Sequence, residues 1–166
     1  MNRLQMALEQ IVFARNYTLW LLGETPTTEW YRVPPGGISH IAWQVGHLAF
    51  AEYRLALLRI RGQQPQDEDL LPQKFVRVFG ANSVPDTDPD KQIAPDEIRA
   101  VLDRIHEQVL RELPGLDEAE LDQAVPQPHP FAKTKLKALL WCAQHEMVHA
   151  GQIGLLRRLL GHAPVW

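Results

Sequence analysis

The chain has 166 residues, of which 45% are hydrophobic, and a formal net charge of -3. This length supports one domain with a buried core, and we predict a single domain over residues 1–166. The acidic and basic residues are interspersed and form no basic cluster that would bind nucleic acid or an anionic membrane surface. No apolar run approaches the roughly 18 residues of a membrane span.

The sequence also bears on the cell compartment and on metal binding. No signal-peptide pattern opens the chain, so we expect a cytoplasmic protein. The single cysteine, Cys142, excludes an internal disulfide and a multi-cysteine zinc site. Any metal ion would therefore need histidine or carboxylate ligands.

Two helices are predicted in the first half of the chain. Over residues 3–22 the apolar positions recur at alternating three- and four-residue spacing, which is typical of an amphipathic helix. A second helix is predicted to begin after Ser39, whose hydroxyl suits an N-cap, and to end at Gly62, which suits a helix stop. Residues 62–93 then form a segment rich in proline and aspartate.

Two more helices are predicted in the second half. The third begins at Pro95, has acidic residues in its first turn and ends before the "PG" at 114 and 115. Its predicted buried positions are Ile98, Val101, Leu102, Ile105 and Val109. The fourth is predicted from about Thr134 to a C-terminal cap at Gly161. No comparable strand signal exists, so the sequence predicts an all-α fold.

Four helices of about twenty residues are typical of a four-helix bundle. The segment 62–93 is long enough to act as a crossover loop that joins the second and third helices in parallel. Such long connections usually serve as lids or subunit contacts.

The run "HEMVH", from His145 to His149, matches the HExxH pattern of zinc metallopeptidases. The two histidines are four residues apart on the last helix, so their side chains leave one face and can reach one metal ion. Common peptidases of this kind take their third ligand from a downstream glutamate or histidine. Here no Asp or Glu follows Glu146, and His162 lies beyond the helix cap. Glu146 is also rotated by about 100° from His145, so a peptidase is disfavoured and the third ligand must come from upstream.

Two histidines of the predicted second helix, His40 and His47, compete for that role. They are two turns apart, about 10 Å along the axis, so both cannot bind one ion. We prefer His47, because His40 lies next to the helix start and is expected to be more exposed. Three imidazoles from two helices leave coordination positions open, which is typical of catalytic sites.

These motifs together resemble the DinB-like superfamily. Its members have a histidine in a "GH(L/I)" motif on the second helix and an HxxxH followed by "GQI" on the last helix. This chain has "HIAWQVGHLAFAEYR" and "KLKALLWCAQHEMVHAGQIGLLRRLLG". The resemblance covers essentially the whole chain except the long middle loop. It implies a four-helix bundle of up-down-down-up topology, a homodimer, and a divalent metal ion on His47, His145 and His149, with Glu146 incidental.

The resemblance also implies activities. Some members are metal-dependent transferases that join bacillithiol, mycothiol or a related low-molecular-weight thiol to an electrophile, and another branch forms the thiol-binding part of ergothioneine-type sulfoxide synthases. A three-histidine divalent ion lowers the pKa of bound water toward about 7, or binds a thiol as the thiolate, so hydrolysis is an alternative to thiol transfer. A site made of three imidazoles can bind zinc, nickel, iron(II) or copper(II), and the sequence does not choose among them.

Four further residues are candidates for a substrate pocket, each with a plainer alternative. Gln152 is predicted on the interior face, either bonded to a ligand or substrate or in an interhelical contact. Arg54 either binds an anionic substrate or is a solvated helix arginine. Trp43 and Trp141 either wall the pocket or belong to the core.

Three more residues have no assigned chemistry. Cys142 is interpreted as a small buried hydrophobe, with a fourth-ligand or thiol role as the alternative. His106 and His129 are interpreted as surface and loop residues. Two functions thus remain open, namely a metal-dependent transferase or hydrolase acting on a small molecule and a non-enzymatic metal-binding or dimerisation bundle.

Overall fold

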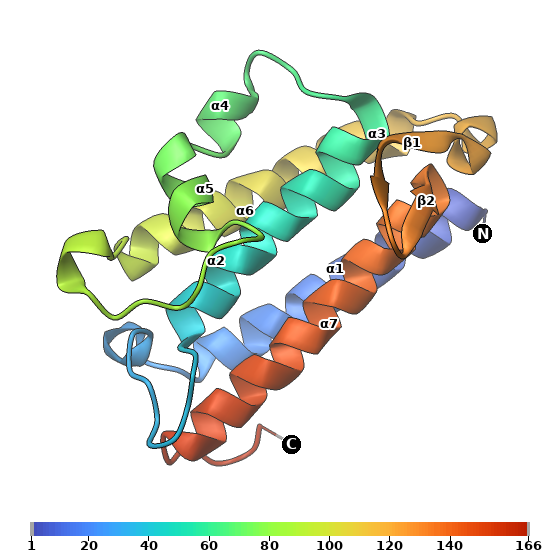
Figure 1. Ribbon diagram of the computed structural model, residues 1–166. Helices are drawn as coiled ribbons and strands as arrows, with labels where there is room; N and C mark the ends of the chain where they lie inside the picture. Colours follow the sequence, from blue (N-terminus) through green and yellow to red (C-terminus); the bar gives the residue numbers. More distant parts are fainter. Residues whose placement is uncertain (1, 166) are drawn as a thin grey trace.

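The protein is mostly helical, and long helices form its body (Figure 1). The computed structural model describes residues 2–165 and, apart from Pro128, their side chains. Met1 and Trp166, the two ends of the predicted domain, lie outside the described residues. The long helices are α1 (Arg3–Gly23), α2 (Ile41–Glu52), α6 (Pro95–Glu112) and α7 (Lys135–Leu159). A π-helical segment, η2 (Tyr53–Leu58), and the short α3 (Arg59–Arg61) prolong α2. The predicted all-α class is therefore confirmed in outline.

Local capping explains where these helices begin and end. Asn2 and Gln5 form a capping box at the start of α1. α7 begins next to Thr134, as predicted, and the Thr134 hydroxyl caps it by accepting a hydrogen bond from the Lys137 amide. Gly62 and Gly161 follow helix ends with φ of 78° and 99°, a region that favours glycine.

The start of α2 differs from the prediction by one residue. The N-cap is His40, whose Nδ1 accepts a hydrogen bond of 3.1 Å from the Trp43 amide. Ser39 instead accepts a hydrogen bond from the Gln44 side chain. The Nδ1 lone pair of His40 thus accepts the hydrogen bond that a Ser, Thr, Asp or Asn side-chain oxygen accepts at most N-caps.

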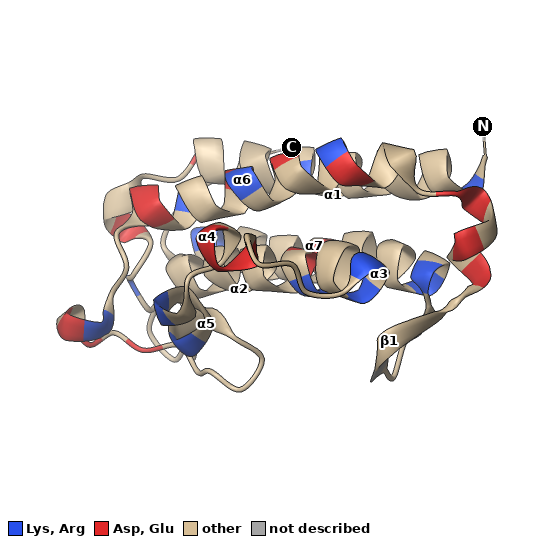
Figure 2. Ribbon diagram, turned by 90° about the horizontal axis from the view of Figure 1, so that it is seen from above, with Lys and Arg blue, Asp and Glu red and all other residues tan. Residues whose placement is uncertain are grey.

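The helices pack around one continuous apolar core. α1 lies along α7, and α2 lies against both α6 and α7. In the view from above, α1 and α6 form one row and α2 and α7 the other (Figure 2). All five core positions predicted for the third helix are buried in α6.

The segment 62–93 is partly helical and is packed onto the bundle. It contains α4 (Asp67–Leu70), α5 (Gln73–Phe79) and the 3-10 turn η3 (Pro89–Lys91). α5 packs on α2 through the buried rings of Phe75 and Phe79. The Asp67 carboxylate accepts hydrogen bonds from Tyr53, Arg61 and the Gln64 amide, which fixes the start of the segment.

A β-hairpin precedes α7, so the expectation of no strands was wrong. It consists of β1 (Ala124–His129) and β2 (Ala132–Thr134), paired antiparallel, and it packs on α7. Short turns precede it, η4 (Leu113–Gly115) and η5 (Glu118–Asp122), and a further turn, η1 (Thr27–Glu29), follows α1. The sequence "AVPQPHPFAKT" misleads because prolines at alternate positions are typical of loops, whereas a short two-stranded ribbon tolerates them.

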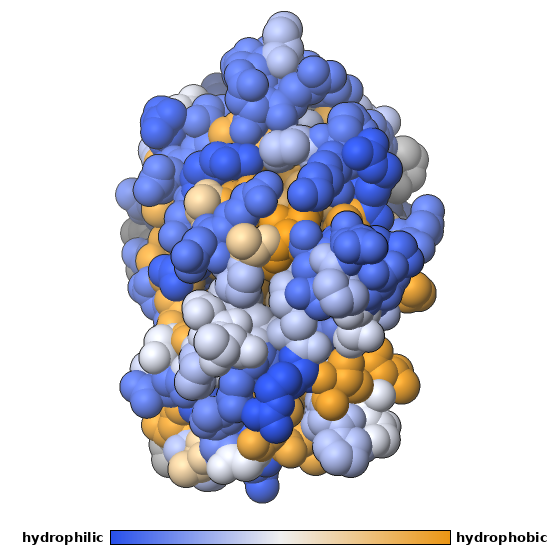
Figure 3. All heavy atoms as spheres, turned by 90° about the vertical axis from the view of Figure 1, so that its left-hand side faces the viewer, coloured by the Kyte–Doolittle hydropathy of each residue, from blue (hydrophilic) through white to orange (hydrophobic). Residues whose placement is uncertain are grey.

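The hairpin and α5 both project from the row formed by α2 and α7, away from α1 and α6 (Figure 2). The face that bears α4 and α5 is mostly hydrophilic, with smaller apolar areas between the polar side chains (Figure 3).

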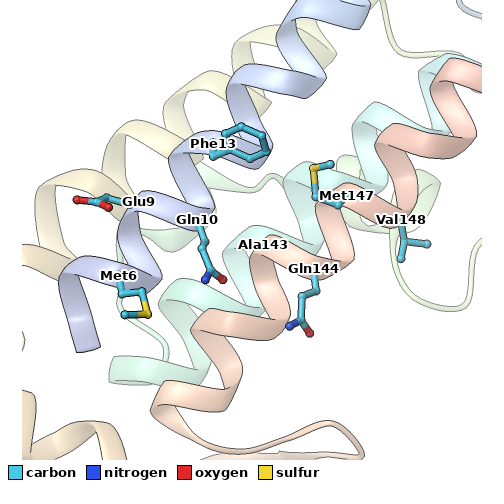
Figure 4. A pocket seen from close by; sticks show the side chains of 8 residues that line it. All are labelled: Met6, Glu9, Gln10, Phe13, Ala143, Gln144, Met147 and Val148. Carbon is cyan, nitrogen blue, oxygen red and sulfur yellow. The ribbon is translucent and has the colours of Figure 1, made fainter. Parts of the chain in front are cut away.

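On another side, an open groove of about 750 Å³ runs between α1 and α7, lined by Met6, Phe13, Met147 and Val148 among others (Figure 4). Among residues 2–165, no helix is long and apolar enough to cross a membrane.

Candidate metal centre

Three histidines converge between α2 and α7. The ring of His47 on α2 lies 5.4 Å from that of His145 and 4.9 Å from that of His149, measured between centroids, and the two α7 rings are 4.5 Å apart. One nitrogen from each ring lies within 4.8 Å of the others. The side chains predicted as metal ligands are therefore brought together from positions about a hundred residues apart.

The long middle segment orients His47. The His47 Nδ1 donates a hydrogen bond of 2.9 Å to the backbone carbonyl of Phe79, at the end of α5. The proton is thus on Nδ1, and Nε2 keeps its lone pair for a metal ion. Gly46 makes this contact possible, because a Cβ at that position would overlap the Phe79 ring. On its other side His47 stacks on Trp43, with centroids 4.8 Å apart and an interplanar angle of 10°.

Gln44 orients His149 in the same way. The His149 Nδ1 donates a hydrogen bond of 2.5 Å to the Gln44 Oε1, and the Gln44 amide nitrogen donates one of 2.8 Å to the Ser39 hydroxyl. The second bond fixes which end of the amide faces the ring. Sequence reasoning missed this residue, although a lone glutamine in the apolar run "IAWQVGHLAF" was a usable signal.

Gln152, for which the sequence left open a bond to a ligand or substrate, lies elsewhere. It is exposed, so its predicted place on the interior face was wrong. Within residues 2–165 no hydrogen bond joins it to His149. The reason is geometric: the inward stripe of α7 continues from His149 to Ile153 and Leu156, which turns residue 152 toward solvent.

Burial keeps the three imidazoles neutral. It lowers the pKa of His145 to about 4, with smaller effects from His47 and His129, and the pKa of His149 to about 3, with smaller effects from the other two rings. Burial also lowers the pKa of His47, partly offset by its bond to Phe79. Neutral imidazole is the form that binds metal, so the site needs no deprotonation at neutral pH.

The arrangement fits a divalent ion after a small contraction. Histidine nitrogens bind zinc at about 2.0–2.1 Å, so ligands of one ion are at most roughly 4 Å apart. The 4.8 Å limit on the ring nitrogens therefore requires shifts of some tenths of an ångström, within the reach of side-chain rotation. The donor set of three neutral imidazoles with two fixed tautomers is that of an open metal site.

The competing residues have other roles. His40 was expected to be exposed, but it is buried, with 1% of its surface exposed. It caps α2 from inside, and its Nε2 donates a hydrogen bond to the Asp86 carbonyl. Both of its ring nitrogens are thus occupied. Burial raises the pKa of the Cys142 thiol, with further effects from Glu52 and Glu146, so it remains protonated. It lies outside the group of converging nitrogens and fits the interpretation as a buried hydrophobe.

Glu146 belongs to a buried charge network, not to the metal centre. Its carboxylate accepts hydrogen bonds from Arg15 at 2.7 and 3.2 Å. Arg15 also donates to Glu52 at 2.7 Å, and Glu52 bonds the ring of His106 at 2.7 Å. Glu146 therefore cannot serve as the water-activating base of a peptidase. His106 was misread as a surface residue, because its partner lies 54 positions away.

Aromatic and cationic side chains surround the centre on the hairpin side. Trp141 meets His145 edge-on at 6.0 Å, and it also contacts Phe131 and His129 of the hairpin. On α2, Phe50 lies 6.0 Å from His47, and the Arg54 guanidinium lies 5.6 Å over the Phe50 ring. Of the suggested pocket residues, Trp43 and Trp141 contact the histidines directly, Arg54 lies beyond Phe50, and Gln152 is exposed.

Comparisons with known proteins agree with this fold. A sequence model of the DinB superfamily matches residues 10–153. A crystal structure of the conserved protein of a locus from Enterococcus faecalis is similar, with a TM-score of 0.70 over 98% of this chain and 99% of that chain. Its sequence identity of 18% supports a shared fold alone. A search of curated proteins finds no match.

Proposed function

The chain belongs to the DinB superfamily, and from this premise we propose that it is a cytoplasmic metalloprotein whose three histidines hold one divalent ion for chemistry on a small molecule. The observation that carries the proposal is the convergence of His47, His145 and His149, two of them with the tautomer fixed for binding through Nε2. The up-down-down-up bundle topology is part of this proposal, supported by the packing of α2 against α6 and α7.

The favoured activity is transfer of a low-molecular-weight thiol to an electrophile, with hydrolysis as the second candidate. A bound divalent ion would supply a thiolate or a hydroxide at neutral pH. In thiol transfer, the thiol sulfur forms a bond to the electrophilic carbon, the leaving group departs with its bonding pair, and the thiol proton passes to solvent. The chain's own contribution is to hold the imidazoles neutral and oriented, and to shelter one side of the site with Trp43.

A non-enzymatic metal-binding bundle is the alternative function. It would require a saturated coordination shell, but among residues 2–165 the converging group consists of three histidines. Three ligands leave an open position, which favours a reactive centre.

Elemental analysis of protein purified without chelator tests the metal centre. We expect close to one equivalent of zinc, nickel or iron in the wild type and a loss of most of it in His47→Ala and His149→Ala. His162→Ala is the matched control, because this histidine pairs with Glu29 at the end of the molecule. Equal metal content in all four proteins would refute the three-histidine centre.

The same proteins then separate the activities. The metal-loaded wild type is incubated with a low-molecular-weight thiol plus an alkylating electrophile, and separately with a chromogenic ester. Faster thiol consumption in the wild type than in His149→Ala supports the transferase, and faster ester cleavage supports the hydrolase. Metal binding without either rate difference would favour the non-enzymatic bundle.

A further inference from the structure

Arg59 of α3 is a buried cation without a carboxylate partner. Its side chain is 6% exposed, and its guanidinium donates only to backbone carbonyls, those of Gln127 and Arg54, at 3.2 and 3.1 Å. Within residues 2–165 no acidic side chain forms an ion pair with it. Buried arginines are normally paired, because an isolated charge in a poorly solvated place costs several kcal/mol.

Two more groups that carry or can accept positive charge lie beside Arg59. The Arg54 guanidinium donates to the Gln127 side chain at 3.1 Å, so β1 connects both arginines. His129, at the end of β1, has its pKa lowered by burial and then by the charges of Arg59 and Arg54. Burial and the charge of Arg54 likewise lower the pKa of Arg59. The three side chains form a cluster in which the two guanidiniums carry the positive charge, and no carboxylate of residues 2–165 forms an ion pair with either of them.

The His129 ring also presents a hydrogen-bond donor. Its Nδ1 accepts a bond of 3.2 Å from the Phe131 amide, so in the neutral ring the proton is on Nε2. Together with the unused N–H groups of the two guanidiniums, this gives a set of donors suited to an anionic oxygen group.

The cluster adjoins the three histidines along two helices. On the α2 side, Arg54 lies over Phe50, which contacts His47. On the α7 side, His129 contacts Trp141, which contacts His145. On each side a single aromatic ring thus separates the cluster from a histidine of the centre. A divalent ion on three neutral imidazoles would add further positive charge, which strengthens the preference for an anion.

We propose that Arg59, Arg54 and His129 bind an anionic oxygen group, a carboxylate or a phosphate, of the substrate that reacts at the histidine centre. This inference rests on the proposed function and adds the substrate class: a small molecule that carries negative charge at some distance from its reacting atom. The missing counter-charge of Arg59 is supplied by the substrate.

Titration calorimetry of the zinc-loaded protein tests the proposal with a matched pair of probes, 3-mercaptopropionate and its uncharged amide. We expect the acid to bind at least tenfold more tightly than the amide. In Arg59→Met and Arg54→Met the two affinities should become nearly equal, whereas Arg158→Met, an exposed arginine of α7, should keep the preference. Competition by succinate and by inorganic phosphate distinguishes a carboxylate site from a phosphate site.

The outcomes separate this inference from the proposed function. Equal binding of acid and amide to the zinc-loaded wild type, or binding of neither, overturns the anion site and leaves the metal centre intact. A wild type that takes up no zinc overturns the proposed function itself. In that case the cluster is still tested by the affinity of the metal-free protein for succinate and phosphate: loss of binding in Arg59→Met supports it, and no binding in the wild type overturns it.

Arg59→Met also distinguishes anion binding from a purely structural role of Arg59. Methionine fills a similar volume without the unpaired charge, so the unliganded variant should unfold at the same temperature as the wild type or higher. A purely structural arginine would instead lower the melting temperature of the variant, and the variant would still prefer the acid probe.

Discussion

Gln44 makes the most specific contact to the metal centre outside the ligands themselves. It fixes the ring of His149, and Ser39 fixes Gln44. We expect Gln44→Met to weaken metal binding by about 10- to 100-fold, because partners of metal-bound histidines typically contribute this much. Competition with a chromophoric chelator measures the change, and Gln152→Met is the control that should leave the affinity unaltered.

Arg15 holds two buried carboxylates from different helices. It is 1% exposed and pairs with Glu52 and Glu146. Arg15→Met would leave both acids without their cation, so the free energy of unfolding should fall by about 3–5 kcal/mol. Urea denaturation measures this loss. Adding Glu146→Gln to the variant should restore part of the stability, and a loss under about 1 kcal/mol in the single variant would contradict the role given to Arg15.

The histidine centre makes the metal-free protein sensitive to acid. A histidine in the unfolded chain titrates near 6.5, whereas the pKa values of His145 and His149 in the folded protein are about 4 and about 3. Between these values the unfolded state binds more protons, so stability is greatest above pH 6.5 and decreases as the pH falls toward 4. The melting temperature should therefore drop between pH 7 and pH 4.5. The drop should be smaller in His149→Gln, and parallel curves for the two proteins would exclude this cause.

At the scale of elements, the contact between α2 and α5 connects the middle segment to the metal centre. Gly46 lets the Phe79 ring lie against α2, and the Phe79 carbonyl orients His47. We expect Gly46→Ala to displace α5, lowering the melting temperature and weakening metal binding by at least tenfold. Gly151→Ala is the matched control, because a Cβ there meets no atom within 4 Å and alanine favours a helix by roughly 1 kcal/mol. Equal metal affinity in the two variants would refute the link.

The elements that the sequence predicts well are those with local signals. The glycine stops at Gly62 and Gly161 and the apolar period of α6 involve residues within a few positions of one another, and the histidine pair of α7 is one turn apart. The remaining features depend on packing between residues that are far apart in the sequence. Gln44 meets His149 across 105 positions, and Arg15 meets Glu146 across 131, distances over which one sequence carries no pattern. The hairpin and the helices of residues 62–93 were missed because they are short and proline-rich, and are stabilised by contacts with α2, α6 and α7.

For the whole molecule, the groove between α1 and α7 bears on assembly. Met6 and Phe13 are 50% and 65% exposed and seven residues apart, and Val148 and Leu155 repeat this spacing on α7 at 54% and 57%. Two neighbouring helices with parallel apolar rows form a face that can pair with its own copy about a two-fold axis. We therefore expect a homodimer through this face.

Substitution of one phenylalanine tests that assembly. The wild type should sediment at about twice the chain mass of 19.0 kDa, and Phe13→Glu should shift it to the monomer without loss of helicity. Phe131→Glu is the control, because this ring is 66% exposed but lies on the hairpin. A monomeric wild type, or a Phe13→Glu dimer, would show that the groove is not the interface.

The π-helical segment η2 lies between α2, which carries His47, and the short α3, which carries Arg59. A π-turn accommodates one residue more than an α-turn, and one residue corresponds to about 100° of rotation. η2 therefore holds one residue more than a continuous α-helix would need between His47 and Arg59. Deleting one residue within η2 should restore a regular α-turn while His47 and Arg59 keep their bearings. The helix can thus gain or lose one residue at η2 without separating Arg59 from the histidine centre.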